Sequence, residues 1–355
     1  MPVLERLAKW DNLKGVLIIC VVIGHFVQYG AVQEELTLFR NVFIYIYSFH
    51  MPMFIFVMGL FYKRTEETQL KTNRIRYYLI LYVGLKTLIF LLRQWLTGEG
   101  NFTLLSEDGT PWYMFAAAVY MGLAYVIRNQ KPAFVVTVSV LLGIFVGYDA
   151  SIGDFLVLSR IFVYAPFFFL GYYAEPKRLA RQLNGRKMNY VIALMVMIGL
   201  AVYCSRNLET AYAYRPLFTG RHAYQVCKGI ENCSGWNRIL SYGIALTVGM
   251  SVAVWMPNRK IPLLNNCGKR SLGIYFWHRL VLYILDFCQV ETFLQAYDLF
   301  WYQMIWMMLA VVLALVLSIS VFEVPLQWLG RLCGDQSTSE KCKMVESKSA
   351  YKNIV

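Results

Sequence analysis

The chain of 355 residues is apolar and strongly basic: 58% of its residues are hydrophobic, 15% are charged, and its formal net charge is +13. Its mean hydropathy of +0.47 is higher than a soluble domain with a solvated surface carries. The composition therefore excludes an ordinary soluble protein and indicates an integral membrane protein. The positive charge fits attraction to anionic lipid headgroups, so it is no sign of nucleic-acid binding.

Ten stretches are candidates for membrane-spanning helices, because about 20 mostly apolar residues cross roughly 30 Å of hydrocarbon. The predicted fold class is an all-α integral membrane protein, a bundle of about ten transmembrane helices in a single domain over residues 1–330. The predicted spans, of which the fourth and the sixth are short, are 11–29, 41–62, 77–96, 111–127, 132–148, 159–174, 189–205, 238–256, 269–288 and 300–323.

Lys and Arg gather in alternate connections between these spans. The segment KRTEETQLKTNRIR at 63–76 is basic, whereas TGEGNFTLLSEDGT at 97–110 is acidic or neutral. The positive-inside rule then predicts that the N- and C-termini are cytoplasmic, with the long, basic loop 206–237 outside as the one exception. The polar segment 331–355 is predicted to be a disordered cytoplasmic tail. We expect a multi-pass protein of the bacterial plasma membrane.

A histidine lies deep in the first predicted span, DNLKGVLIICVVIGHFVQYG at 11–30. His25 is fourteen residues beyond Asp11, or roughly 21 Å at 1.5 Å per residue, which places it past the membrane centre. An ionisable group at that depth is costly and indicates a functional site. The alternative is a histidine that packs by hydrogen bonding between helices.

The second predicted span carries a histidine at a similar depth. Counting inward from residue 41 places His50 roughly 14 Å down the helix, and the short connection 30–40 makes the first two spans antiparallel neighbours. Pro52 cannot donate to the carbonyl of Ser48, so the helix loosens beside His50. Loosened backbone is tolerated at membrane depth only where protein or water covers it. The two histidines are therefore predicted to share one polar chamber.

Two of the eight cysteines, Cys227 and Cys233, lie in the predicted outer loop. A disulfide between them and two unpaired thiols remain equally open. A zinc site formed with His222 lacks a fourth ligand and a usual spacing, so no metal site is predicted.

The sequence resembles the integral-membrane acyltransferase 3 family, and within it the branch named for fucose 4-O-acetylases. The matching residues begin with Asp11, Lys14 and Gly24–His25 in the first span. The further matching segments, in chain order, are SFHMPMFIFVMGLFYK, NRIRYYLILY, PWYMFAAAVY, SRIFVYAPFFFLGYY, SLGIYFWHRLV and FEVPLQWLG. The resemblance covers nearly the whole chain. It implies transfer of acyl groups, usually acetyl, from cytoplasmic acyl-coenzyme A to sugars or other acceptors of the cell envelope.

Transfer from a thioester to a hydroxyl requires a base for the hydroxyl proton and donors for the developing oxyanion. Histidine suits the first task, so His25 and His50 are the predicted catalytic residues, with His25 as the base. The phosphates of the donor require cations, which Arg74 and Arg76 could provide, with Lys14 nearby. In many relatives the two arginines are three apart rather than two. The alternative for these arginines is that they only set the topology.

Arg160, Trp112 and His278 are the predicted acceptor-binding residues. The alternatives are that Arg160 reaches the lipid headgroups, that Trp112 is an interfacial aromatic residue, and that His278 is structural. Acetyl-CoA is expected as a co-substrate, with no permanently bound cofactor, and the expected partners are an envelope glycan or another hydroxyl acceptor and membrane lipids. The alternative function is a transporter or flippase, since intramembrane His and Arg also line substrate pathways.

Overall fold

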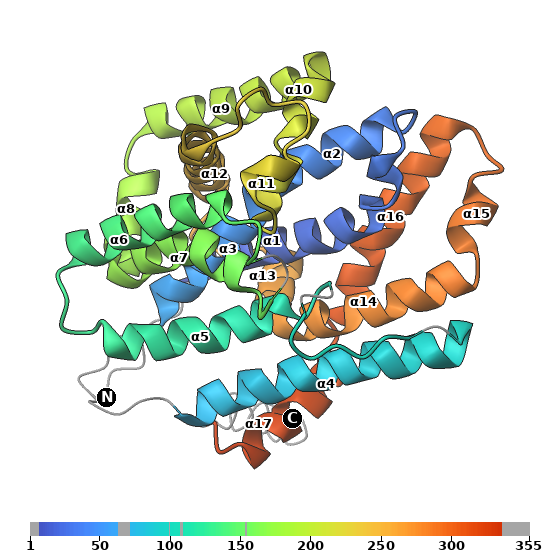
Figure 1. The fold of residues 1–355 in the computed structure, drawn as a ribbon, viewed down its shortest axis with the longest axis horizontal. Helices are drawn as coiled ribbons and strands as arrows, with labels where there is room; N and C mark the ends of the chain where they lie inside the picture. The colour runs from blue at the N-terminus through green and yellow to red at the C-terminus, as the bar shows by residue number, and fades with distance from the viewer. Residues whose placement is uncertain (1–6, 63–71, 99, 107–108, 153–154, 336–355) are drawn as a thin grey trace, which may run out of the picture.

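The computed structural model of the chain describes residues 7–62, 72–98, 100–106, 109–152 and 155–335 (Figure 1). These residues form helices and no named strand; the one β-bridge joins Ser106 to Phe155. The predicted all-α fold is therefore confirmed for the described part of the chain. Most of the predicted tail, residues 336–355, lies outside it.

A helix is found at each of the ten predicted spans. The corresponding helices are α1 (Ala8–Val27), α2 (Thr37–Tyr47) with α3 (His50–Phe61), α4 (Thr72–Thr97), α5 (Trp112–Val126), α6 (Pro132–Phe145), α7 (Leu158–Tyr173), α9 (Lys187–Arg206), α12 (Gly235–Trp255), α14 (Ser271–Phe287) and α16 (Leu299–Leu317).

Short helical segments lie in the connections, at the ends of two predicted spans and after the last span, and the spacing of apolar residues did not predict them. They are α8 (Pro176–Asn184), α10 (Leu208–Ala213), α11 (Arg215–Thr219), α13 (Pro262–Lys269), α15 (Val290–Leu294) and α17 (Val324–Leu332), together with 3₁₀ turns at Gly30–Val32, Val146–Tyr148, Tyr224–Val226 and Ser320–Glu323.

Six of the described helices are long and apolar enough to cross a membrane: α1, α2 with α3, α4, α9, α12 and α16. The other four predicted spans correspond to α5, α6, α7 and α14, which have 15, 14, 16 and 17 residues. The predicted count of about ten spans is therefore not confirmed. The difference arises because these helices are shorter than the roughly 20 residues that a full crossing takes.

Helix α1 lies in the interior of the bundle (Figure 1) and packs against α13, α16, α14, α2 and α3. It begins at Ala8, three residues before Asp11, so Asp11 lies in the first turn, where its Oδ1 is 2.8 Å from Lys14 Nζ. By contrast, α9 at the periphery buries little of its surface and exposes Val191, Met195 and Ile198. An apolar exposed face of this kind is what a lipid-facing helix presents.

Long-range hydrogen bonds gather the connections into two groups. At one end Lys9 donates to Asn184 Oδ1 at 2.7 Å and to the Met256 carbonyl at 2.8 Å, while Asn12 donates to the Arg259 carbonyl at 2.9 Å. At the other end Arg40 binds Glu209, and Leu156 N–H donates to the Leu105 carbonyl at 2.7 Å. The first group contains predicted inside segments and the inner ends of two predicted spans, and the second contains only predicted outside segments.

Candidate active site

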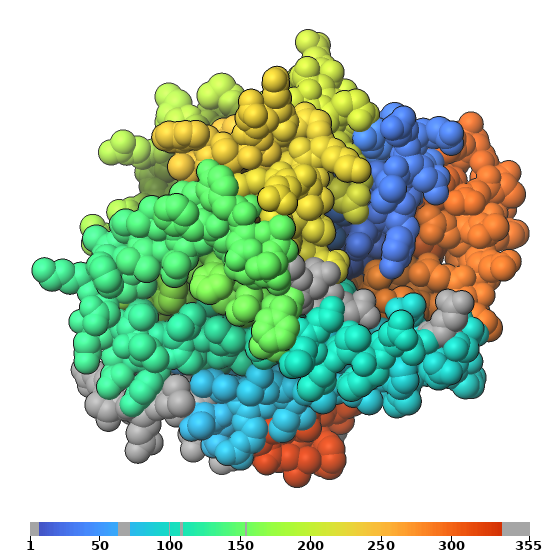
Figure 2. Space-filling model, viewed as in Figure 1, coloured from blue at the N-terminus to red at the C-terminus, as the bar shows by residue number. Residues whose placement is uncertain are grey.

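A cavity of about 340 Å³ lies where α1, α2, α3, α5, α7, α11 and α14 meet. We call it the histidine cavity; among its lining residues are His25, His50, Trp112, Arg160, Arg215 and Arg279. The residues of α11 and the loop that follows it, yellow in Figure 2, meet α2, in blue, on the viewed face. The structure thus brings together the two histidines that the depth argument paired.

Each of the three histidines on α1, α3 and α14 has its Nδ1 atom beside an oxygen acceptor. His25 Nδ1 lies 3.1 Å from Gln28 Oε1, His50 Nδ1 lies 2.8 Å from the Ile46 carbonyl oxygen, and His278 Nδ1 lies 3.0 Å from that of Ile274. An oxygen of this kind can only accept, so the neutral rings carry their proton on Nδ1. The Nε2 atoms are consequently left with their lone pairs available to take up a proton.

The backbone breaks next to His50, as Pro52 predicted. Helix α2 ends at Tyr47 and α3 begins at His50, with Phe49 between them at φ −137°. Because of the break, the Ile46 carbonyl accepts from the Phe49 N–H at 3.2 Å and from the imidazole of His50. The neutral His50 in this tautomer accepts a hydrogen bond at Nε2, so donation to a thioester oxygen would require a protonated ring.

His278 lies behind His25 rather than in the cavity wall. It is fully buried and its ring centroid is 5.1 Å from that of His25. Its Nε2 atom has no hydrogen-bond partner among the described residues. The predicted acceptor-binding residue therefore contacts the predicted base directly. That neighbour could not be read from the sequence, because 253 residues separate the two histidines.

Arg160 and Trp112 lie together in the wall of the histidine cavity. The Arg160 guanidinium is 4.5 Å from the centre of the Trp112 ring, which stacks on Tyr164 at 5.5 Å. Both residues thus occupy the cavity, as an acceptor-binding role requires, and neither is confined to the lipid surface.

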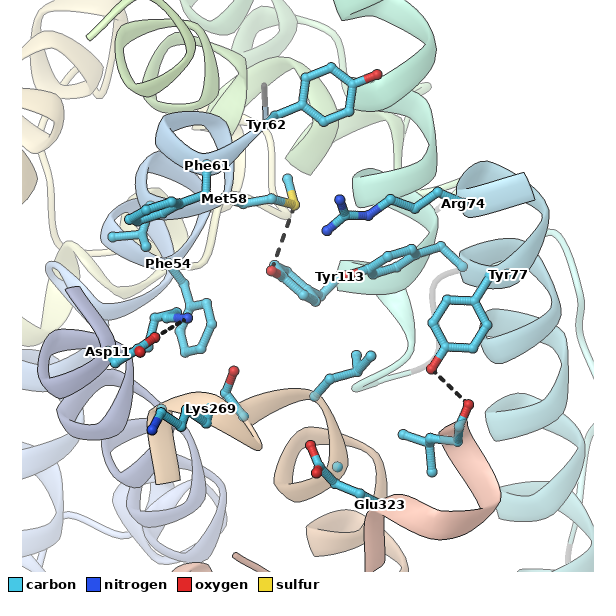
Figure 3. Close-up of a pocket in the computed structure, with 18 of the residues that line it drawn as sticks. Asp11, Phe54, Met58, Phe61, Tyr62, Arg74, Tyr77, Tyr113, Lys269 and Glu323 are labelled. Carbon is cyan, nitrogen blue, oxygen red and sulfur yellow. Dashed lines mark hydrogen bonds and ion pairs between the residues drawn. The ribbon is translucent and has the colours of Figure 1, made fainter. Parts of the chain in front are cut away.

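A second cavity, of about 320 Å³, lies toward the end of the molecule where the predicted inside segments meet. We call it the cationic cavity after its cations Lys14, Arg74 and Lys269; three carboxylates, those of Asp11, Glu323 and Asp335, line it as well. Figure 3 shows the Arg74 side chain extending from α4 into this space, with Asp11 and Lys269 on the opposite side and Glu323 below. No ion pair joins Arg74 to a carboxylate in the described part of the chain.

Arg76 is placed differently from Arg74. It is exposed and does not line the cationic cavity. Two residues along a helix correspond to a rotation of about 200°, so the side chains of Arg74 and Arg76 leave the helix on opposite sides. Lys269, which the sequence analysis did not select, lies in the cavity instead.

A narrow cavity of about 50 Å³ lies between the two larger ones. This tyrosine passage shares Met51 and Tyr275 with the histidine cavity and shares Phe54, Tyr78 and Tyr113 with the cationic cavity. The rings of Tyr113 and Tyr275 lie 5.2 Å apart, and Tyr113 O–H donates to Met58 Sδ at 3.7 Å (Figure 3). Sequence analysis missed the passage because only the crossing of α5 and α14 brings these tyrosines together.

Cys227 and Cys233 lie beside each other in the outer loop, both as free thiols. Burial, and then the hydrogen bond with Cys233, raise the pKa of Cys227 to about 12, so the thiol stays protonated. The described residues contain no group of three or more His, Cys, Asp or Glu side chains placed to hold a metal ion.

Comparison with known proteins identifies the family. A family described as an acyltransferase domain, acyltransferase 3, matches residues 7–323. The nodulation protein NolL of Mesorhizobium japonicum is 28% identical over 228 residues, a match that covers 60% of this chain and 60% of NolL. No solved structure matches significantly. The chain belongs to the acyltransferase 3 family, a family of acyltransferase domains.

Proposed function

We propose that the protein is an O-acetyltransferase of the cell membrane that moves the acetyl group of cytoplasmic acetyl-CoA to a hydroxyl of a cell-envelope sugar or a similar acceptor. The series of three cavities carries the proposal. A phosphate-bearing donor and a separate hydroxyl acceptor need two chambers of different chemistry that meet at a base.

The cationic cavity suits the donor. Arg74 and Lys269 supply positive charge for the phosphates, and Lys14, paired with Asp11, adds a third cation to the wall. The flexible arm of the coenzyme would then extend through the tyrosine passage, between Tyr113 and Tyr275, and bring the thioester to the histidine cavity. At about 50 Å³ the passage has no room for the nucleotide, so only the arm of the coenzyme would enter it.

The histidine cavity suits the chemistry. His25 is half-buried in the wall, and its Nε2 lone pair takes the proton of the acceptor hydroxyl as the oxygen attacks the thioester carbon. Collapse of the tetrahedral intermediate breaks the carbon–sulfur bond, and the imidazolium returns its proton to the leaving thiolate. The products are the acetyl ester and coenzyme A. Gln28 and His278 hold the His25 ring from two sides, as positioning residues.

The test uses the purified full-length protein in detergent with acetyl-CoA labelled in the acetyl group. The parent is expected to cleave the thioester and to transfer the label to an added hydroxyl acceptor. His25→Ala is expected to lose roughly 10²- to 10⁴-fold in turnover, the usual contribution of a positioned base. Its affinity for acetyl-CoA should stay within a few-fold of the parent, because His25 does not line the cationic cavity.

His50→Ala is expected to lose a comparable amount, because residues that act as a unit are not additive. A monodisperse His25→Ala protein that binds donor and keeps turnover within a few-fold of the parent would exclude His25 as the base. A parent that neither cleaves acetyl-CoA nor transfers the acetyl group would contradict the choice of donor.

A further inference from the structure

Among the residues that the structure describes, the charged side chains that line the histidine cavity are all positive. Four arginines line it, Arg160, Arg215, Arg221 and Arg279, whereas none of its described lining residues is Asp or Glu. Glu107 and Asp108, which precede the lining residue Gly109, lie outside the described residues. Of the four arginines, Arg215 and Arg279 make all of their contacts with described residues.

Arg279 is buried without enough acceptors. Its side chain is 5% exposed, and its Nη2 donates to the Tyr29 hydroxyl at 2.6 Å and to the Tyr283 hydroxyl at 3.5 Å. Its Nε and Nη1 atoms have no hydrogen-bond partner among the residues that the structure describes. No ion pair joins Arg279 to a carboxylate of the described residues, Asp286 on the same helix included. A buried cation with unfilled donors is costly unless a ligand supplies acceptors.

Arg215 also lines the cavity, and no carboxylate of the described residues forms an ion pair with it. Its Nη1 donates to the Tyr212 hydroxyl at 3.0 Å, and its guanidinium lies 5.2 Å from the centre of the Phe43 ring. Glu209, the nearest carboxylate in the sequence, is already bound by Arg40 through both of its oxygens. The hydrogen bond from Arg40 is the largest cause that holds the pKa of Glu209 below its usual value, so this carboxylate stays ionised and occupied.

Guanidinium groups bind carboxylate and phosphate oxygens with paired, charge-assisted hydrogen bonds. On the proposed function, the acceptor is the molecule that occupies this cavity while it reacts at His25. We propose that the acceptor carries an anionic group, a carboxylate or a phosphate ester, and that Arg215 and Arg279 bind it beside the base. A cavity of about 340 Å³ is at the small end of ligand pockets, so the anionic group belongs to the sugar unit that is acetylated or to its neighbour.

The site is tested with three probes of matched size: a neutral methyl hexoside, the corresponding hexuronide and the hexose 1-phosphate. Their affinities for the purified full-length protein are measured by calorimetry. At least one anionic probe is expected to bind about tenfold or more tightly than the neutral probe, the effect of one charge-assisted hydrogen bond or more. The hexuronide and phosphate arms distinguish a carboxylate from a phosphate acceptor.

Arg215→Gln and Arg279→Gln are each expected to reduce the preference for the anionic probe about tenfold. Arg279→Lys should retain part of it, because the charge remains. Arg128→Gln is the matched control: Arg128 donates to the Tyr125 carbonyl at 2.7 Å and does not line the histidine cavity, so the preference should persist.

Equal affinity for the three probes, or no measurable binding of the two anionic ones, would overturn the inference. An equal loss of neutral and anionic binding in the Arg279→Gln protein would do so as well, since it would indicate packing rather than charge recognition. Cleavage of acetyl-CoA by the parent is measured in the same preparation. If the parent cleaves acetyl-CoA but shows no preference for an anionic probe, the acyl-transfer proposal stands and the proposal of an anionic acceptor is wrong.

Discussion

At the scale of single residues, the depth of His25 and His50 in their spans was sufficient to predict one shared cavity, and both residues line it. The contact of His278 with His25 was not predictable, because it depends on how α1 and α14 pack. The tautomers of His50 and His278 could not be predicted either. They depend on the carbonyl oxygens of Ile46 and Ile274, whose positions beside the Nδ1 atoms follow from the fold. Sequence identifies the titratable residue, whereas its protonation site depends on backbone geometry.

The two arginines of the motif Arg74-Ile75-Arg76 provide a matched pair of variants. Sequence analysis gave them the same role, but only Arg74 lines the cationic cavity. Arg74→Gln is expected to weaken acetyl-CoA binding by about 1.5 to 3 kcal/mol, the contribution of a charge-assisted hydrogen bond. Arg76→Gln should change it by less than about 0.5 kcal/mol, as a typical surface substitution does. Donor affinity is measured by calorimetry.

Equal losses in the two variants would place the donor on the exposed side of α4 as well. If neither variant loses affinity for acetyl-CoA, the two arginines do not bind the donor and serve only to set the topology.

At the scale of elements, hydrophobic length was enough to predict a helix at each of the ten stretches, and Pro52 was enough to predict the break between α2 and α3. The short helices of the connections were missed because their stability comes from packing rather than from their own sequence. Close contacts between helices were not predicted either. Gly59 on α3 and Gly171 on α7 let the two backbones meet, since an added Cβ at either position would overlap a carbonyl oxygen of the other helix, that of Phe168 or Phe56.

Gly171→Ala tests this crossing of α3 and α7. The added methyl group would force the backbones apart, because the atom that it meets belongs to the main chain and cannot rotate away. We expect a destabilisation of about 1 to 3 kcal/mol, as overpacking of a core usually causes. It is measured as the loss of resistance to unfolding in mixed detergent and dodecyl sulfate micelles.

Gly199→Ala on α9 is the control for the chemical change itself. Nothing lies within 4 Å of a Cβ at that position, so alanine should be neutral or should stabilise the helix by about 0.5 to 1 kcal/mol. Similar stability of the two variants would show that α3 and α7 have room to separate and that the crossing does not depend on the glycines.

At the scale of the whole molecule, the distribution of Lys and Arg sorted the connections into two groups, and the hydrogen bonds of the fold join members within each group. The cationic cavity lies near the first group and the histidine cavity near the second. Such an arrangement is what a donor from one side and an acceptor from the other require. The four shorter helices, α5, α6, α7 and α14, run between the same two ends. We therefore still propose ten crossings of the membrane. Local thinning of the bilayer would accommodate the helices that are shorter than a full crossing.

The orientation of the molecule is tested by thiol labelling in intact cells. In an active cysteine-free background, single cysteines replace Glu231 in the predicted outer loop and Arg259 in a predicted inner connection, both of which are exposed. An impermeant maleimide is expected to label the cysteine at 231 directly and the cysteine at 259 only after the membrane is permeabilised, because the basic connections stay in the cytoplasm. Labelling at 259 without labelling at 231 in intact cells would reverse the orientation. The histidine cavity would then lie on the inner side, and the acceptor would have to be a cytoplasmic molecule.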